Sequence, residues 1–198
     1  MIRHLKMLKC AVCFTLAAAA CSQAVSARHV SGELRKWHKV TLTFDGPETS
    51  ETADPNPFLY YRLNVTFKHQ KSGKSYLVPG YYAADGDAAN TSADSGNKWR
   101  VHFAPEQVGT WKYNVSFRKG RNVAVDERKN AGQSAGFMDG QSGSFDIGST
   151  DKTGRDLRGK GLLRYVGKHH LRFAETSEYF LKCGADALGF IFASSPRR

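Results

Sequence analysis

Short segments in which apolar and polar residues alternate constrain this chain more than any other feature of its sequence. Alternation with a period of two places every second side chain on the same face of a β-strand, so such a segment has one buried and one exposed face. The alternation predicts strands over Lys39–Phe44, Tyr61–Lys68, Lys98–Phe103, Trp111–Arg118 and Ser144–Ile147. Ser75–Tyr82 is a further expected strand, with Pro79-Gly80 marking a bulge or an edge.

The segments between these strands are rich in glycine, asparagine, aspartate and serine, which favour turns. They cover Asp45–Pro57, Ala83–Gly96 and Gly120–Gly143. After residue 27 no segment shows a helical period. Many short strands punctuated by turns indicate an all-β fold, an immunoglobulin-like antiparallel β-sandwich over residues 33–148.

The segment Phe103–Trp111 contains Pro-Glu-Gln-Val-Gly between two expected strands. We expect it to be a corner that carries the chain from one sheet to the other. Trp99 and Trp111 stand at inward positions of those strands, and we expect both in the core because a buried indole removes a large area from water.

The first 27 residues have the three parts of a secretory signal peptide. A basic start over residues 1–9 precedes an apolar run over Cys10–Cys21, and Ala24–Ala27 supplies small residues before a cleavage site. The apolar run is shorter than the roughly 20 residues that span a bilayer, so we expect no transmembrane segment. The expected location is secreted or periplasmic, with lipid attachment at Cys21 as the alternative.

Cleavage after residue 27 would leave a basic chain with Cys183 as its one cysteine. The net charge of the full sequence is +11, and loss of the three cationic residues of the leader leaves +8. The sandwich must then fold without an internal disulfide, as domains of about 100 residues commonly do. For an exported protein we expect no nucleic acid as partner, and the charge favours an anionic polysaccharide or surface.

Beyond the sandwich the sequence predicts a unit too small to fold alone, because a two-stranded hairpin is marginal in water. We call it the stub; it contains a hairpin turning at Gly167-Lys168. We expect it to be less ordered than the sandwich, or to rest loosely on the sandwich through Leu162, Tyr165 and Phe173. The expected boundaries are a signal peptide at 1–27, the sandwich at 33–148, a linker at 149–161, the stub at 162–187 and a divergent tail at 188–198.

Three stretches of the chain resemble a known family. They are Trp37 with Val40–Pro47, then Pro79–Gly86 with Trp99–Pro105 and Gly109–Trp111, and finally Gly167–Phe173 with Glu178–Asp186. Together they resemble the immunoglobulin-like module of unknown function found at the N-terminus of secreted glycoside hydrolases, where it precedes a TIM-barrel catalytic domain. The resemblance implies that the stub is the entry to such a barrel.

The sequence departs from that family after Asp186, where the barrel does not follow. Since the catalytic carboxylates of a barrel lie at the ends of its strands, we expect no catalytic residue and no enzymatic activity in this chain. The expected function is that of a non-catalytic secreted module, accessory to a carbohydrate-active protein, with glycan binding as its candidate activity. The alternative is an N-terminal fragment of a glycoside hydrolase that lacks its catalytic barrel.

Cations on the outward faces of two strands form the first candidate site. If these strands are neighbours, the cations make one basic stripe for an anionic glycan, and exposed tyrosines would stack on the sugars; a solvated face is the alternative. The candidate ligand-binding residues are Lys98, Arg100, His102, Lys112, Arg118, Tyr81 and Tyr82.

The loop after Tyr82 gathers oxygen ligands of the kind that calcium prefers. They are Asp85, Asp87, Asn90 and Asp94. A closing glutamate and flanking helices, which an EF-hand requires, are missing, so we expect no cofactor and keep calcium as an alternative to a polar turn. The glycosylation sequons at Asn64, Asn90 and Asn114 are expected to be exposed.

Overall fold

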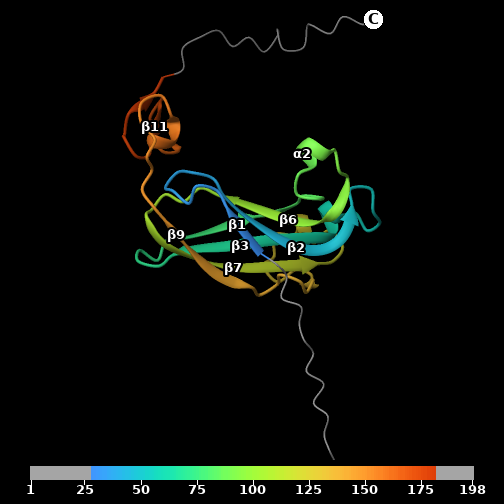
Figure 1. Ribbon diagram of the computed structural model, residues 1–198. Helices are drawn as coiled ribbons and strands as arrows, with labels where there is room; N and C mark the ends of the chain where they lie inside the picture. Colours follow the sequence, from blue (N-terminus) through green and yellow to red (C-terminus); the bar gives the residue numbers. More distant parts are fainter. Residues whose placement is uncertain (1–27, 182–198) are drawn as a thin grey trace, which may run out of the picture.

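The computed structural model describes residues 28–181, which form two antiparallel sheets packed face to face and a small third sheet at one end (Figure 1). The expected immunoglobulin-like β-sandwich is therefore confirmed. The expected signal peptide, the lipid-attachment site Cys21, Cys183 and the tail at 188–198 lie outside the described residues.

The first sheet has the strand order β1-β2-β6-β5. Its strands are β1 Arg28–Ser31, β2 Val40–Ser50, β5 Tyr81–Tyr82 and β6 Ser95–Phe103. The second sheet has the order β4-β3-β7-β8, and β9 also pairs with β7. Its strands are β3 Tyr61–His69, β4 Ser75–Pro79, β7 Gly109–Lys119, β8 Gln133–Ser134 and β9 Ser142–Ile147.

The core lies between these two sheets and is built from the inward residues that the alternation predicted. Trp99 and Trp111 are 2% and 0% exposed, which confirms their expected burial. Across the sheets, the rings of Phe67 and Phe103 stack with centroids 4.3 Å apart. The indole of Trp111 meets Phe103 edge-on at 4.9 Å, an arrangement that adds to the free energy gained by burial alone.

The chain crosses between the sheets at three places: between β2 and β3, at Gly80 between β4 and β5, and after Phe103 between β6 and β7. The expected corner after Phe103 is confirmed, because β6 and β7 belong to different sheets. The second crossing is a single residue, Gly80, since β4 pairs with β3 and β5 pairs with β6. A Cβ atom on Gly80 would lie 2.5 Å from Cδ2 of Leu63 and 2.8 Å from the carbonyl oxygen of Arg100. The two sheets approach this closely only because the residue is glycine.

The expectation that a loop begins at Asp45 is wrong, because β2 continues to Ser50 with a register shift between Asp45 and Thr49. Short helices occupy parts of the expected loops. They are α1 Pro57–Tyr60, α2 Ala88–Thr91 and the 3-10 turns η1 Val123–Val125 and η2 Leu157–Gly159. Within residues 28–181 no helix has the length and apolar character needed to cross a membrane.

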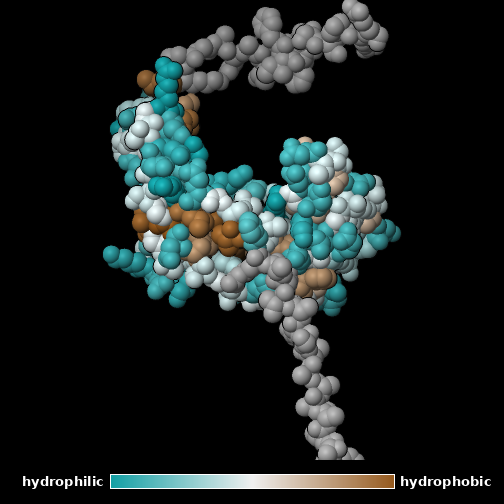
Figure 2. All heavy atoms as spheres, viewed as in Figure 1, coloured by the Kyte–Doolittle hydropathy of each residue, from teal (hydrophilic) through white to brown (hydrophobic). Residues whose placement is uncertain are grey.

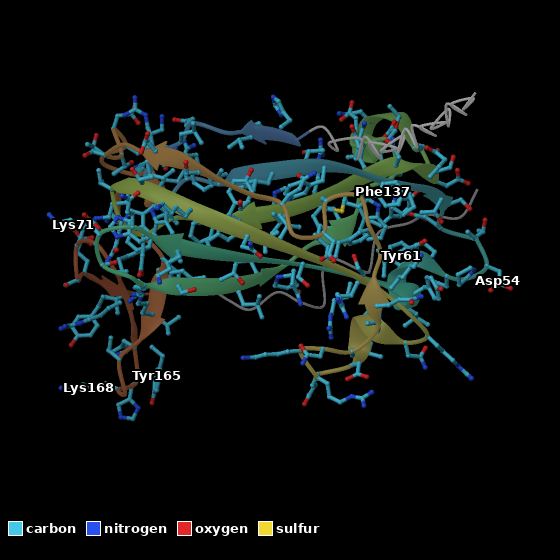
Figure 3. All side chains as sticks on the ribbon, turned by 90° about the horizontal axis from the view of Figure 1, so that it is seen from below. Asp54, Tyr61, Lys71, Phe137, Tyr165 and Lys168 are labelled. Carbon is cyan, nitrogen blue, oxygen red and sulfur yellow. The ribbon has the colours of Figure 1, made fainter. Side chains whose placement is uncertain are left out.

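The third sheet forms the described part of the stub. It has the order β10-β11-β12, with β10 Leu163–Tyr165, β11 Leu171–Phe173 and β12 Tyr179–Phe180. The stub lies at the end of the sandwich marked by Lys71, and Tyr165 and Lys168 project away from it (Figure 3). Figure 2 shows the stub as a mainly hydrophilic body above a hydrophobic area of the sandwich.

Polar side chains, rather than the expected apolar ones, join the stub to the sandwich. The indole of Trp37 donates to Glu175 with Nε1 2.9 Å from Oε2, and Lys36 donates to the same carboxylate at 2.8 Å. Tyr165 is 74% exposed and Leu162 is 49% exposed, so the expectation that these two rest on the sandwich is wrong. Phe173 is buried.

The linker is also bonded to the sandwich. The imidazole of His38, which is 2% exposed, pairs through Nε2 with the hydroxyl of Thr150 at 3.1 Å. Its Nδ1 lies 3.2 Å from a carboxylate oxygen of Glu33, which also meets Lys152 at 3.3 Å. The linker therefore folds back on the start of the sandwich instead of hanging free.

Candidate ligand-binding site

Four side chains form a row across the outward face of the first sheet. The strand register pairs His29 with Thr43, Thr43 with Arg100, and Arg100 with Tyr81. Directly paired residues point to the same side of a sheet, so all four leave the core in the same direction. Arg100 donates through Nε to the hydroxyl of Thr43 at 3.1 Å, which orients its guanidinium along this face.

His102 forms a hydrogen bond with Tyr81, the aromatic residue at the end of this row. Its Nε2 lies 2.8 Å from the hydroxyl of Tyr81, and its Nδ1 lies 2.9 Å from the hydroxyl of Thr41. Partial burial, helped by the positive charges of Lys39 and Arg100, lowers the pKa of the imidazole below its usual value of about 6.5. The ring is therefore neutral at pH 7 and serves as one donor and one acceptor for the two hydroxyls.

We expect the imidazole of His102 to titrate below about pH 6.5 and the variant Lys39→Gln to raise its midpoint, because one repelling cation is removed. Because the folded pKa is the lower one, the unfolded state binds more protons between the two values. The contribution of His102 to stability is thus present above about pH 6.5 and lost as the pH falls through the folded value. NMR titration of the His102 ring protons measures the midpoint.

The control for this titration is Lys112→Gln, which removes a cation from β7 in the other sheet and should leave the His102 midpoint unchanged. A His102 midpoint at or above the usual value, or equal shifts in the two variants, would contradict the electrostatic explanation.

Two cavities flank Tyr81, whose ring is 43% exposed. The first, of about 260 Å³, we call the α1 cavity; its walls include Phe58, Arg62, Leu63, Asn64 and Pro79. The second, of about 280 Å³, we call the α2 cavity; its walls include Glu51, Gly86, Asp87, Ala88 and Arg100. Tyr81 and Tyr82 line both cavities, so the two cavities are neighbours; we call the two cavities together with Tyr81 the Tyr81 groove.

The two cavities lie away from the stub. Tyr61, which also lines the α1 cavity, lies at the same end of the sandwich as Asp54, whereas Tyr165 of the stub lies at the other end (Figure 3). Helix α2, which borders the α2 cavity, is likewise far from β11 in Figure 1. Tyr81 itself lies nearer the middle of the first sheet, opposite Arg100 and three residues before the end of β6.

The expected continuous basic stripe is wrong. Lys98, Arg100 and His102 lie on β6 in the first sheet, whereas Lys112 and Arg118 lie on β7 in the second. The outward faces of the two sheets of a sandwich point in opposite directions, so the cations separate into two groups. Lys98 is also paired with Asp45.

Of the two tyrosines in the candidate ligand-binding set, the structure exposes Tyr81 and buries Tyr82, which is 6% exposed. The expectation for Tyr82 is wrong because Tyr82 points inward, where its ring packs against Trp99 at 5.3 Å. The structure thus brings together Tyr81, Arg100 and His102 from the predicted set.

Phe58 is an element of the groove that the alternation could not reveal. It lies on α1, where the side chain of Asn56 accepts a hydrogen bond from the Phe58 amide at 2.9 Å and proline occupies the first helical position. Asparagine followed by proline is a helix-start signal, which was present in the sequence within a segment expected to be a loop. The ring of Phe58 is 49% exposed and meets Tyr82 edge-on at 6.1 Å.

The four candidate calcium ligands lie in the segment between β5 and β6, residues 83–94, which contains α2 and which we call the α2 loop. Three of them form hydrogen bonds within this loop. Asp85 accepts from the amide of Asp87 at 2.7 Å and from the hydroxyl of Thr91 at 2.7 Å, and Asp87 accepts from the side chain of Asn90 at 2.8 Å. The bond from Thr91, that from Asp87 and the charge of Arg100 lower the pKa of Asp85. Calcium binding by this loop, with Asp94, stays a prediction.

Among residues 28–181, one group of three metal-ligating side chains has its donor atoms within 4.8 Å of one another: Glu33, His38 and Asp151. The ammonium of Lys152 lies 3.3 Å from Glu33 and 3.2 Å from Asp151, between the two carboxylates. A lysine already neutralises the position that a metal ion would take, so we interpret this group as the ion cluster that ties the linker down.

The three sequons differ in exposure. Asn90 and Asn114 are exposed, as expected, whereas Asn64 is half-buried beside the α1 cavity. Modification of these residues stays a prediction.

No curated protein matches the chain. Among solved structures, a chain described as a putative glycoside hydrolase from Bacteroides vulgatus ATCC 8482 is 24% identical with a TM-score of 0.45. The match covers 74% of this chain and 21% of that one, so this chain spans about a fifth of the length of that protein. The model of a domain of unknown function, DUF5060, matches residues 33–118, a segment that contains all the groove residues named above.

Proposed function

We propose that the sandwich is a non-catalytic, exported module that accompanies a carbohydrate-active protein and binds a glycan in the Tyr81 groove. The observation that carries this proposal is the exposed ring of Tyr81, braced by His102 and flanked by two cavities. Each cavity is below the range of about 300–1,000 Å³ of drug-sized sites, a size that suits one sugar unit. An aromatic ring with polar groups on both sides matches a ligand that has apolar faces and hydroxyl edges.

The test is binding of residues 28–198 to an array of plant, bacterial and animal glycans, followed by titration calorimetry with the best ligand. We expect Tyr81→Ala to weaken binding at least about tenfold, which corresponds to about 1.4 kcal/mol. The matched control is Tyr165→Ala, which removes an exposed tyrosine ring from β10 of the stub, outside the Tyr81 groove. Binding that survives Tyr81→Ala, or an array without any bound glycan, would refute the proposal.

A second candidate function, the N-terminal part of a glycoside hydrolase, is favoured by the stub. Leu163, Tyr165 and Leu171 share one face of its sheet with Phe173; the first three are exposed, whereas Phe173 is buried. Sheets of this size usually need a second layer over such a face. Sequencing of the gene beyond the codon of Asp186 distinguishes the candidates, because a reading frame that encodes a barrel would support the hydrolase.

A further inference from the structure

The walls of the α1 cavity are mainly apolar. Leu63 is 2% exposed, Phe58 and Pro79 cover the sides, and the missing side chain of Gly80 leaves the cavity open next to Leu63. A Cβ atom on Gly80 would lie 2.6 Å from Cγ of Leu63 and would fill this space. A ligand group in this position therefore meets carbon on most sides.

The arginine that borders this cavity is already engaged. The guanidinium of Arg62 donates to the carbonyl oxygens of Asp126, Arg128 and Lys129, in the last two cases at 3.2 and 3.1 Å. Arg62 shapes the wall, and its two terminal NH2 groups are used by the backbone of residues 126–129, while its Nε has no hydrogen-bond partner within the described residues. The other polar side chains that line the cavity are neutral: Asn64, Tyr61, Tyr81, Tyr82 and Trp99.

A plain hexose, with hydroxyls around the whole ring, is a poor fit to this environment. Each hydroxyl placed against Leu63, Phe58 or Pro79 would lose its hydrogen bonds to water without replacement, which is unfavourable for a buried polar group. A methyl group in the same place gains free energy from burial. One amide beside an apolar wall also suits an acetyl group, whose carbonyl accepts while its methyl packs.

The α2 cavity has the opposite character. Arg100, Glu51 and Asp87 line it, and they offer both donors and acceptors to sugar hydroxyls. Because Tyr81 separates this charged cavity from the apolar one, the two ends of the groove select different sugar units.

Resting on the proposed function, we infer that the α1 cavity is the specificity subsite of the groove and takes a sugar unit that carries a methyl group. Such a unit is an acetylated sugar or a 6-deoxy sugar. The neighbouring unit of the same glycan lies over Tyr81 with its hydroxyls at Arg100. The Tyr81 groove then selects a substituted glycan. It also selects the orientation of that glycan, because the substituted sugar unit has to lie on one side of the unit over Tyr81.

The experiment compares matched pairs of glycans by titration calorimetry with residues 28–198. The pairs are acetylated xylan and the same xylan after alkaline deacetylation, tetra-N-acetylchitotetraose and chitotetraose, and a fucosylated oligosaccharide and its defucosylated parent. We expect the methyl-bearing member of at least one pair to bind about tenfold more tightly or better, the usual value of one methyl group in an apolar pocket. Which pairs show this preference distinguishes the acetyl from the 6-deoxy group.

Two variants locate the preference. Phe58→Ala, on a half-exposed ring, should reduce the preference within the pair to near unity while weaker binding remains. Arg100→Gln should weaken both members of the pair by the same factor. Tight binding of glycans with no preference in any pair would overturn this inference and leave the proposed function standing, whereas absence of binding to every glycan overturns both.

Discussion

Replacing Trp111 by alanine is expected to lower the free energy of unfolding by about 3–5 kcal/mol, the usual loss for a large buried aromatic residue. Trp111 is fully buried, and its ring contacts Phe103 and His69 with centroids 4.9 and 5.1 Å away. Its Nε1 donates to the carbonyl of Gln107 at 2.9 Å, so the substitution also leaves a buried acceptor in the corner without its donor.

This loss is a large part of the total of about 5–15 kcal/mol that is typical of a domain, so the Trp111 variant should unfold at much lower urea. Urea denaturation followed by circular dichroism measures it. The matched control is Leu77→Ala on β4, because Leu77 is 62% exposed and its truncation should change stability by about 0.5 kcal/mol or less. Equal losses for the two variants would show that Trp111 does not lie in the core.

Replacing Gly96 by alanine is the second substitution with a large expected effect, about 2–4 kcal/mol of stability. Gly96 has a φ of +147°, a region that L-residues with a side chain avoid. Its added Cβ would lie 2.4 Å from the carbonyl oxygen of Ala84, so the α2 loop would have to move away from β6. Strain and steric overlap therefore act together at this position.

The control for Gly96 is Gly73→Ala in the turn between β3 and β4. Gly73 also has a positive φ, of 71°, but a Cβ there meets no atom within 4 Å. That variant should lose only about 1–2 kcal/mol from the left-handed conformation itself. Thermal unfolding of both variants separates the backbone strain from the steric overlap. A Gly96 variant as stable as the Gly73 variant would show that the α2 loop can move away from β6 without loss of stability.

The positions of the strands were predictable because alternation is a local property of the sequence. The continuation of β2 beyond Asp45 was not, because Asp-Gly-Pro is a turn-forming sequence when considered alone. Gly46 stays in the sheet because its missing side chain leaves room for the indole of Trp99; a Cβ would lie 2.4 Å from Cδ1 of that ring. The contact partner comes from β6, far along the chain, and no local pattern reports it.

The candidate site was predictable to the same limited extent. Alternation correctly assigns Arg100 and His102 to the outward face of their strand, but it does not say which strands are neighbours. The corner between β6 and β7, itself recognised in the sequence, is what separates Lys112 and Arg118 from the other cations. Tyr81 pairs with Arg100 only because the chain passes from the second sheet to the first at Gly80. This passage depends on the close packing of Gly80 against Leu63.

Tyr81 lies opposite Arg100, three residues before β6 ends at Phe103, so only about 10 Å of strand separates it from the corner that follows. The same corner contacts the stub, because Glu106 pairs with Arg164. A glycan held at Tyr81 would therefore lie nearer to the stub than the full length of the sandwich, and the stub would limit how far that glycan can extend in this direction.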